Sequence, residues 1–372
     1  MRNLSWVKEE WMLALTLLTA GIFVFTGGPP KEAASLTLVW LLVVILISSF
    51  AVVKHAEAIA HKVGEPLGTL ILTLSVTGLE VVIIAASMFN SKGNPALGRD
   101  AMFAVTMIIL NGMVGVSLLL GGLRHHEQTY NLRGANSFLA VIMPLAVIGL
   151  ILPNFTKSTI GPTFSPLQAV LLIVLALGLY CVFLAIQNAR HKNYFITTSE
   201  EEEPIHIEAG ELALSWHCIL LAVYLVPLVY LCKQLAYPLD AGLAAIGAPI
   251  AMGGFLVAVL VLSPESVSAV RAAQKNLLQR SINILLGSVL ATIGLTIPAV
   301  LIIGLVTGKT IVLGLEPAGI VLLVLTLMLS MHTFNSGRTN MLLGIVHILL
   351  FIAYIILLFD QPGYGALALR TH

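Results

Sequence analysis

The sequence predicts an all-α membrane protein whose chain crosses the bilayer many times. Of its 372 residues, 58% are hydrophobic and 10% are charged, and the mean hydropathy is +0.99. Apolar runs recur along the whole chain, and each is long enough for a helix to cross a hydrocarbon core about 30 Å thick. A soluble domain does not need this much apolar surface, so the composition excludes an ordinary soluble globular fold.

Hydropathy divides the chain into eleven predicted spanning helices. They cover approximately residues 10–26, 35–53, 67–89, 101–122, 137–153, 166–187, 214–232, 247–270, 281–304, 317–335 and 341–359. The longest polar segment, which is rich in glutamate, follows the sixth helix. We therefore expect four parts, which are an accessory helix in 1–34, a five-helix repeat in 35–187, an acidic cytoplasmic linker in 188–213 and a second five-helix repeat in 214–372.

A repeat with an odd number of helices enters the membrane in opposite directions in its two copies, as in inverted-repeat transporters. The sequence supports such a duplication, because Gly64-Glu65-Pro66 opens the third predicted helix and Gly247-Ala248-Pro249 opens the eighth. A Gly-rich span follows in each half. The layout predicts one accessory helix plus two inverted repeats.

The distribution of basic residues predicts the orientation. Alternate loops divide the 19 Lys and Arg residues twelve to seven, and the richer side is expected to face the cytoplasm. The N-terminus would then be cytoplasmic and the C-terminus outside, in a bacterial inner membrane.

The net charge of +1 gives no electrostatic reason to expect a nucleic-acid partner. Three isolated cysteines, Cys181, Cys218 and Cys232, do not have metal-site spacing.

Two carboxylates are the main functional signal. Glu80 is the only charged residue between Pro66 and Ser91, and Glu265 is the only one between Ala241 and Val270. A charged side chain inside a bilayer is costly and usually belongs to an ion pathway. We therefore predict that both glutamates bind the transported cation and carry protons. The alternative is a structural carboxylate that is hydrogen-bonded to a neighbouring helix.

Residues beside the glutamates complete the predicted site. Thr77 precedes Glu80, and Ser263-Pro264 precedes Glu265. Proline removes a backbone donor, so we expect a helix break that frees carbonyl oxygens as ligands. Carboxylates, hydroxyls and carbonyls are hard oxygen ligands, which suit Ca2+ as the transported substrate better than Zn2+ or copper. We expect no bound cofactor, and the predicted metal ligands are Glu80, Glu265, Thr77 and Ser263.

Two carboxylates in one cavity also explain proton coupling. They cannot both stay ionised without a cation, so either protons or a cation occupies the site. Alternating exposure of the site to the two sides then gives antiport. A phosphate-binding loop for ATP is missing from the sequence, so transport would be secondary. A cation channel remains an alternative, whereas an intramembrane metalloprotease would need a motif such as HExxH, which does not occur, so we expect no enzyme.

The segments that carry these features resemble the repeats of bacterial Ca2+/H+ antiporters of the cation/proton exchanger family, of the ChaA type. They run from Gly64 through Val81, from Leu262 through Thr292 and from Ser336 through Gly344. The resemblance implies eleven helices and cation-binding glutamates at Glu80 and Glu265. It also implies that Na+ or K+ can replace Ca2+ as the cation partner.

Other polar residues have structural interpretations. Asn111, Ser117, Ser288, Thr292 and Asn340 are expected to hold helices together. His332 and His347 could carry protons, but satisfied interior histidines are the favoured interpretation. A polar run of His55, Glu57, His61 and Lys62, with His125 and His126 in the next cytoplasmic loop, could sense pH or form a solvated connector.

Overall fold

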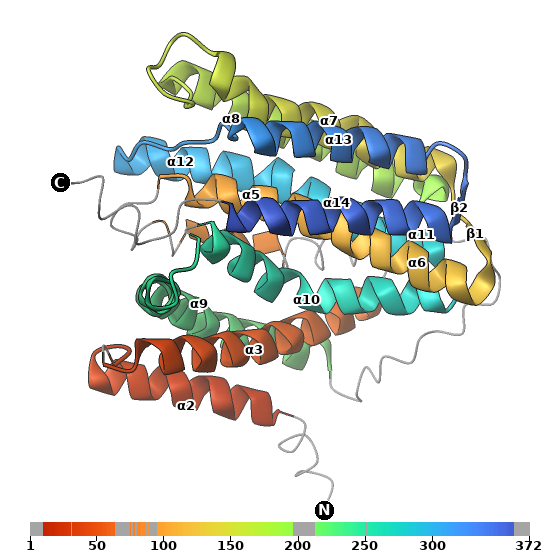
Figure 1. Cartoon of the computed structure of the whole chain (residues 1–372). Helices are drawn as coiled ribbons and strands as arrows, with labels where there is room; N and C mark the ends of the chain where they lie inside the picture. The colour runs from red at the N-terminus through yellow and green to blue at the C-terminus, as the bar shows by residue number, and fades with distance from the viewer. Residues whose placement is uncertain are drawn as a thin grey trace, which may run out of the picture. The chain divides into compact units, whose positions relative to one another are not determined.

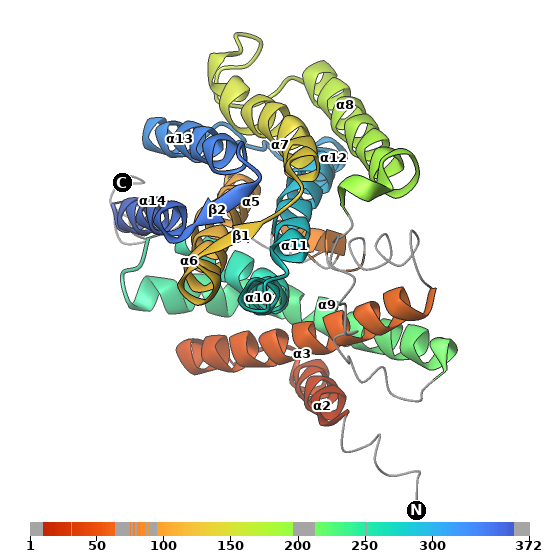
Figure 2. The ribbon, with the colours of Figure 1, turned by 90° about the vertical axis from the view of Figure 1, so that its right-hand side faces the viewer.

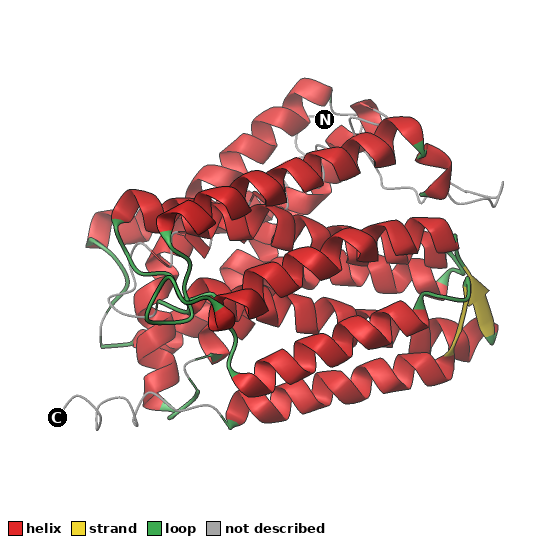
Figure 3. Ribbon diagram, turned by 90° about the horizontal axis from the view of Figure 1, so that it is seen from above, coloured by secondary structure: helices red, strands yellow, loops and turns green. Residues whose placement is uncertain are grey.

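The computed structural model describes residues 10–30, 32–63, 95–195, 213–249 and 251–360, and single helical positions between 75 and 88 (75, 77, 78, 80–82, 84, 85 and 88). Its regular elements in these ranges are helices, apart from one pair of three-residue strands (Figure 3). Eight helical segments in the described ranges are long and apolar enough to cross a membrane, and two shorter apolar helices accompany them. The predicted class, an all-α polytopic membrane protein, is confirmed.

Ten of the eleven predicted spans coincide with described helices. The third predicted span, residues 67–89, lies largely outside the described residues, and the positions described within it are helical. Most of the predicted acidic linker of residues 188–213, namely residues 196–212, also lies outside them. The division into two inverted repeats stays a prediction, because neighbouring contacts group the chain differently, into two compact units that each contain segments from both halves of the sequence.

Unit 1 comprises Met1–Gly93, Glu203–Pro264 and Pro362–His372. Its described helices are α2 (Trp11–Thr26), α3 (Ala34–Val63), α9 (Leu214–Ala245) and the part of α10 (Met252–Gln274) up to Pro264. Helices α3 and α9 pack against each other, and α2 contacts both (Figure 1). On α3, the fully buried residues Leu41, Ile45 and Val52 recur every four to seven positions, which places them on one helical face. That face packs in the core of unit 1 with Tyr224 of α9.

The outward positions of these helices are apolar as well. Leu36 and Val39 of α3 are exposed, and so are Val226 of α9 and Phe25 of α2. A helix that is apolar all around is typical of a segment surrounded by lipid. A hydrogen bond of 2.7 Å joins the hydroxyls of Thr16 on α2 and Ser48 on α3, which is a common way to hold two helices together where no water competes.

Unit 2 comprises Asn94–Glu202 and Glu265–Gln361. Its elements are α5 (Leu97–Met107), η1 (Ile108–Met113), α6 (Val114–His125), β1 (Glu127–Thr129), α7 (Leu132–Ala146), η2 (Val147–Ile151), η3 (Leu152–Phe155), α8 (Pro166–Ala185), η4 (Ile186–Arg190), η5 (Lys192–Tyr194), the rest of α10, α11 (Leu278–Ala291), η6 (Thr292–Thr296), α12 (Ile297–Thr307), α13 (Pro317–Thr333), β2 (Arg338–Asn340) and α14 (Met341–Phe359). Within this unit α14 packs against α6 and α13 contacts α14 and α7, while α12 contacts α8 and α11 contacts α7 (Figure 2).

The described part of unit 2 contains four π-helical segments, η1, η2, η4 and η6, and two of them join one α-helix to the next within a span. The turn η1 lies between α5 and α6, and η6 lies between α11 and α12. Each turn includes a buried glycine, Gly112 in η1 and Gly294 in η6. Single π turns inside α-helices occur frequently at functional sites. Both turns fall in the third helix of a predicted repeat.

A short antiparallel strand pair joins two loops of unit 2. Strand β1 pairs with β2 in the register Glu127↔Asn340, Gln128↔Thr339 and Thr129↔Arg338. Beside the pair, the hydroxyl of Tyr130 donates to the carbonyl of Thr333 and accepts from the backbone N–H of Gly337, both at 3.2 Å. Burial raises the pKa of Tyr130, which keeps its hydroxyl protonated as a donor. These strands are not predictable from the sequence, because three residues carry too little alternation to be recognised.

Helix α10 corrects one expectation. We expected a helix break at Ser263-Pro264, but α10 continues through Pro264 from Met252 to Gln274. Proline in a helix interior still lacks the N–H that the carbonyl four residues earlier would accept, and that carbonyl belongs to Leu260. Neighbouring helices commonly allow a membrane helix to tolerate proline without unwinding. The break predicted at Pro264 is therefore wrong, while the missing backbone hydrogen bond remains.

Candidate functional site

Glu80 and Thr77 lie in unit 1 at helical positions of the third predicted span. Both are buried, with exposed fractions of 3% for Glu80 and 4% for Thr77. Residues three apart in a helix lie on the same face, so the Thr77 hydroxyl and the Glu80 carboxylate point in similar directions. The side-chain oxygen Oε1 of Glu80 is shielded from solvent. Glu80 and Thr77 are therefore both buried, while their role as cation ligands stays a prediction.

Glu265 lies in α10, in the part that belongs to unit 2. Its side chain is partly buried, and its oxygen Oε2 is shielded from solvent. Ser263, two residues earlier, donates its hydroxyl hydrogen to the carbonyl of Val259 within the same helix. The hydroxyl hydrogen of Ser263 is used in this bond, and the lone pairs of its oxygen stay available to a cation.

The four predicted ligands thus fall in two groups. Thr77 and Glu80 belong to unit 1, as does Ser263, whereas Glu265 belongs to unit 2. The meeting of the two carboxylates around one cation stays a prediction. Among the described residues, no group of three or more His, Cys, Asp and Glu side chains has a geometry that could hold a metal ion.

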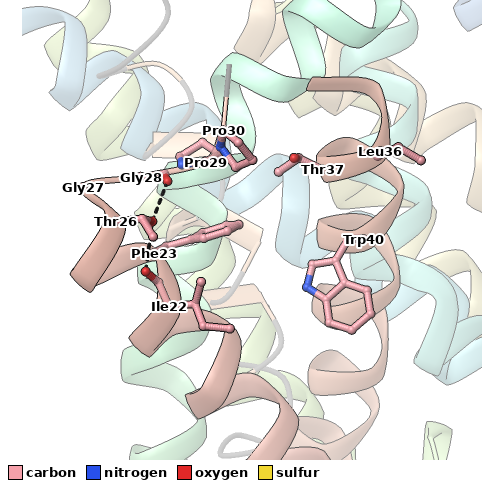
Figure 4. A pocket seen from close by; sticks show the side chains of 10 residues that line it. All are labelled: Ile22, Phe23, Thr26, Gly27, Gly28, Pro29, Pro30, Leu36, Thr37 and Trp40. Carbon is pink, nitrogen blue, oxygen red and sulfur yellow. Dashed lines mark hydrogen bonds between the residues drawn. The ribbon is translucent and has the colours of Figure 1, made fainter. Parts of the chain in front are cut away.

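A pocket of about 630 Å³ lies in unit 1 where α2 and α3 come together. Phe23, Thr37 and Trp40 line it, together with the turn around Gly28 (Figure 4). The hydroxyl of Thr26 is engaged with the carbonyls of Ile22 and Gly28 at 2.9 and 3.0 Å. Among the described residues no charged side chain lines this pocket, so these walls have the character of a lipid-facing recess rather than a cation site.

A buried polar cluster in unit 1 was not predicted. It joins Glu10, which precedes α2, to His55 of α3 and to His217 and Tyr224 of α9. Each of these side chains has an exposed fraction of 7% or less. The interpretation of the run around His55 as a solvated connector is therefore wrong for His55 itself, although His61 is exposed. Spacing could not reveal the cluster, because its members come from three distant helices.

A second buried network lies in unit 2 around Asn111 of η1. The amide Nδ2 of Asn111 donates to Thr326 at 2.8 Å, and its Oδ1 lies 3.3 Å from Nδ1 of His347. The Nε2 of His347 lies 2.9 Å from the hydroxyl of Thr333. Because Oδ1 of an amide only accepts, Nδ1 of His347 carries the hydrogen and Nε2 accepts from Thr333. Asn111 therefore holds helices together, as expected, and both ring nitrogens of His347 have hydrogen-bond partners in the interior, which was the favoured interpretation.

Comparison with known proteins identifies the family. A model of the family described as sodium/calcium exchanger protein matches residues 33–188 and again residues 216–359. The chain belongs to the sodium/calcium exchanger family. Its members exchange ions across membranes, so the chain is an integral membrane transporter.

Individual relatives agree with this membership. The chain is similar to the sodium-potassium/proton antiporter ChaA of Escherichia coli, with 40% identity over 356 residues, which cover 95% of this chain and 96% of that protein. It is also similar to the Ca(2+)/H(+) antiporter of Aphanothece halophytica, with 24% identity over 86% of this chain and 90% of that protein. The resemblance to the ChaA type of cation/proton exchangers is thereby confirmed.

A solved structure shares the fold of this exchanger. The crystal structure of the selenium-substituted Ca2+/H+ antiporter protein YfkE superposes with a TM-score of 0.73, covering 94% of this chain and 98% of that chain. The sequence identity is 16%, so the likeness concerns the arrangement of the helices alone.

Proposed function

We propose that this protein is a secondary active transporter that exchanges Ca2+ for protons by alternating access at a site shared by Glu80 and Glu265. The observation that carries this proposal is a buried carboxylate in a membrane span of a chain that belongs to the exchanger family. Glu80 has an exposed fraction of 3%, and a buried carboxylate needs a proton or a cation to offset the loss of water around its charge.

The coupling follows from the chemistry of two carboxylates. In a cavity of low dielectric, the pair binds either a divalent cation or protons, because two negative charges cannot remain there uncompensated. The occupied site is exposed to one side of the bilayer and then to the other. Each exposure to the opposite side exchanges one occupant for the other, which is antiport.

Two further observations support an internal repeat around this site. The family model matches the chain twice, over residues 33–188 and 216–359. In the third helix of each predicted repeat a π turn also joins two α-helices, η1 in the first and η6 in the second, whereas the π turns η2 and η4 of the first repeat have no counterpart among the described residues of the second. We propose that Glu80 and Glu265 are equivalent residues of two inverted repeats, so that both contribute to one site near the middle of the membrane.

The ligand set favours oxygen-binding cations. Glu80, Glu265, Thr77 and Ser263 offer carboxylate and hydroxyl oxygens, which are hard ligands that Ca2+ prefers. The second candidate is exchange of Na+ or K+ for protons on the same scaffold. The name of the Escherichia coli relative, a sodium-potassium/proton antiporter, favours it, whereas the name of the Aphanothece relative favours Ca2+.

We also propose an orientation in a bacterial inner membrane, with the N-terminus in the cytoplasm and the C-terminus outside. The support is the excess of Lys and Arg on alternate loops. Accessibility of a single cysteine placed at either terminus to a membrane-impermeant reagent in intact cells and in inverted vesicles tests this orientation.

The experiment for the function uses full-length protein in sealed vesicles that contain a pH-sensitive dye. Addition of Ca2+ outside is expected to drive protons out of the vesicles, and an imposed pH gradient is expected to drive Ca2+ uptake. A channel would conduct Ca2+ without moving protons. Parallel additions of Na+ and K+, alone and in competition with Ca2+, rank the cations.

Glu80→Gln and Glu265→Gln test the two carboxylates separately. Each is expected to reduce exchange to the level of protein-free vesicles, because an amide neither titrates nor offers a charged ligand. The matched control is Glu127→Gln on β1, whose side chain has an exposed fraction of 62% and which should exchange like the wild type. Substantial Ca2+/H+ exchange in both site variants would contradict the assignment.

A further inference from the structure

The cluster of Glu10, His55, His217 and Tyr224 joins three helices of unit 1. The hydroxyl of Tyr224 on α9 donates to Oε2 of Glu10 at 2.7 Å. The same oxygen lies 3.4 Å from Nε2 of His55 on α3. Ring nitrogens Nδ1 of His55 and His217 lie 3.1 Å apart. Glu10 thus connects the start of α2 to both α3 and α9.

The geometry assigns the hydrogens of the two imidazoles. An ionised carboxylate only accepts hydrogen bonds, so Nε2 of His55 must carry a hydrogen. If His55 is neutral, its Nδ1 is bare and accepts a hydrogen from Nδ1 of His217. His217 then holds its hydrogen on Nδ1 and has a bare Nε2. That nitrogen is shielded from solvent and has no hydrogen-bond partner among the described residues.

This arrangement accommodates one additional proton without rearranging the side chains. A proton that binds Nε2 of His217 makes that ring cationic, and the hydrogen on its Nδ1 can then transfer to Nδ1 of His55, because the two nitrogens lie 3.1 Å apart. His55 becomes the imidazolium, and His217 becomes neutral with its hydrogen on Nε2. The positive charge therefore ends beside the carboxylate of Glu10, where an opposite charge stabilises it.

Two lysines and a tyrosine act on the imidazole pair of this cluster in the part of the chain that the structure describes. The ammonium of Lys54 on α3 lies 3.7 Å from Oε1 of Glu10, and its side chain is 41% exposed. Lys62 of the same helix also acts electrostatically on His217. Tyr224 faces Glu10 and lies near His55, with their ring centroids 5.6 Å apart. Within the described residues these groups, with Glu10, are the titratable and charged neighbours of the imidazole pair.

We propose that Glu10, His55, His217 and Tyr224 form a proton-binding site, separate from the predicted Glu80–Glu265 site, in which two imidazoles share one added proton beside Glu10. The charge that results tightens the contact of α2 with α3 and α9, which makes the accessory helix sensitive to pH. The effect of this site on exchange rests on the proposed function, whereas its protonation does not.

The direct test is nuclear magnetic resonance of ring-15N-labelled histidine in the full-length protein in lipid nanodiscs, without Ca2+ and without a pH gradient. His55→Gln and His217→Gln identify the two resonances. As the pH is lowered, the His55 ring is expected to become doubly protonated. In the same titration His217 is expected to change from the Nδ1–H to the Nε2–H tautomer. Two rings that titrate independently, or His217 with Nε2–H throughout, would overturn the proposal.

Two substitutions are expected to move this titration in opposite directions. Glu10→Gln removes the counter-charge and should shift the midpoint of His55 toward acid by about one pH unit or more. Tyr224→Phe keeps the charge but removes a hydrogen bond to it, so the less stabilised carboxylate should shift the midpoint toward alkaline pH. A purely structural role would move both the same way. His61→Gln, on the exposed side of α3, is the control and should leave the midpoint unchanged.

The pH profile of exchange gives the second readout. Glu10→Gln and Tyr224→Phe are expected to move the profile of proteoliposomes in the same directions as they move the histidine titration. If wild-type vesicles do not exchange, the proposed function fails while the titration still decides the proton site. A profile that is unchanged in both variants, with the titration shifted, would refute the regulatory role.

Discussion

Gly344 lies where α14 approaches α6 so closely that a side chain does not fit. A Cβ atom at this position would lie 2.6 Å from the backbone N of Leu119 and 2.8 Å from the carbonyl oxygen of Gly115. Ordinary contact of a Cβ begins near 3.4 Å. The neighbours are backbone atoms of another helix, so Gly344→Ala can be accommodated only if the two helices separate by about 0.8 Å, the difference between the two distances.

The expected cost follows from this separation. Overpacking of a close-packed core costs typically about 1–3 kcal/mol. Alanine regains about 1 kcal/mol through its higher helix propensity, so we expect a net loss of up to about 2 kcal/mol for Gly344→Ala. The displacement also affects the bond of 3.3 Å between His347 of α14 and Asn111 of η1, because only one of its two partners moves with α14.

Thermal unfolding of the purified protein in nanodiscs measures this loss. The control is Gly178→Ala in α8, where a Cβ meets nothing within 4 Å and the same propensity gain applies. Gly178→Ala should be as stable as the wild type or slightly more stable, while Gly344→Ala should unfold a few degrees lower. Equal unfolding temperatures for the two variants would refute the argument from helix contact.

Three further substitutions test the described contacts of unit 2 by the same measurement. Asn111→Leu removes the hydrogen bonds to Thr326 and His347. We expect the free energy of unfolding to fall by about 1–2 kcal/mol, since such bonds between membrane helices contribute about 0.6 kcal/mol or somewhat more each. Unchanged stability would contradict this expectation. Gln128→Leu leaves the carbonyl of Ala273 without the side-chain amide donor that now lies 2.8 Å away. We expect the free energy of unfolding to fall by about 1–3 kcal/mol. A variant more stable than the wild type would contradict this expectation. Glu127→Gln breaks the exposed ion pair with Arg338, whose charged atoms lie 3.9 Å apart. We expect the free energy of unfolding to change by less than about 1 kcal/mol at any salt concentration. A larger, salt-dependent loss would contradict the assignment of this pair as a weak surface contact.

The sequence by itself determined the class of the protein and the approximate position of its helices. Runs of apolar residues that match the thickness of a bilayer follow from the cost of exposing backbone hydrogen-bonding groups to lipid, so hydropathy alone places ten of the eleven spans on described helices. The buried positions of Glu80 and Thr77 were equally visible, because a charged residue that interrupts such a run is conspicuous.

Tertiary structure decided what depends on contacts between distant segments. The continuity of α10 through Pro264, the strand pair and the cluster of Glu10, His55 and His217 were not predictable from local pattern. In a span that is apolar on every side, periodicity does not distinguish the face toward lipid from the face toward protein. Which polar side chains meet is then set by how the helices pack, and a hydrogen bond between residues 162 positions apart, such as that between His55 and His217, appears only after packing.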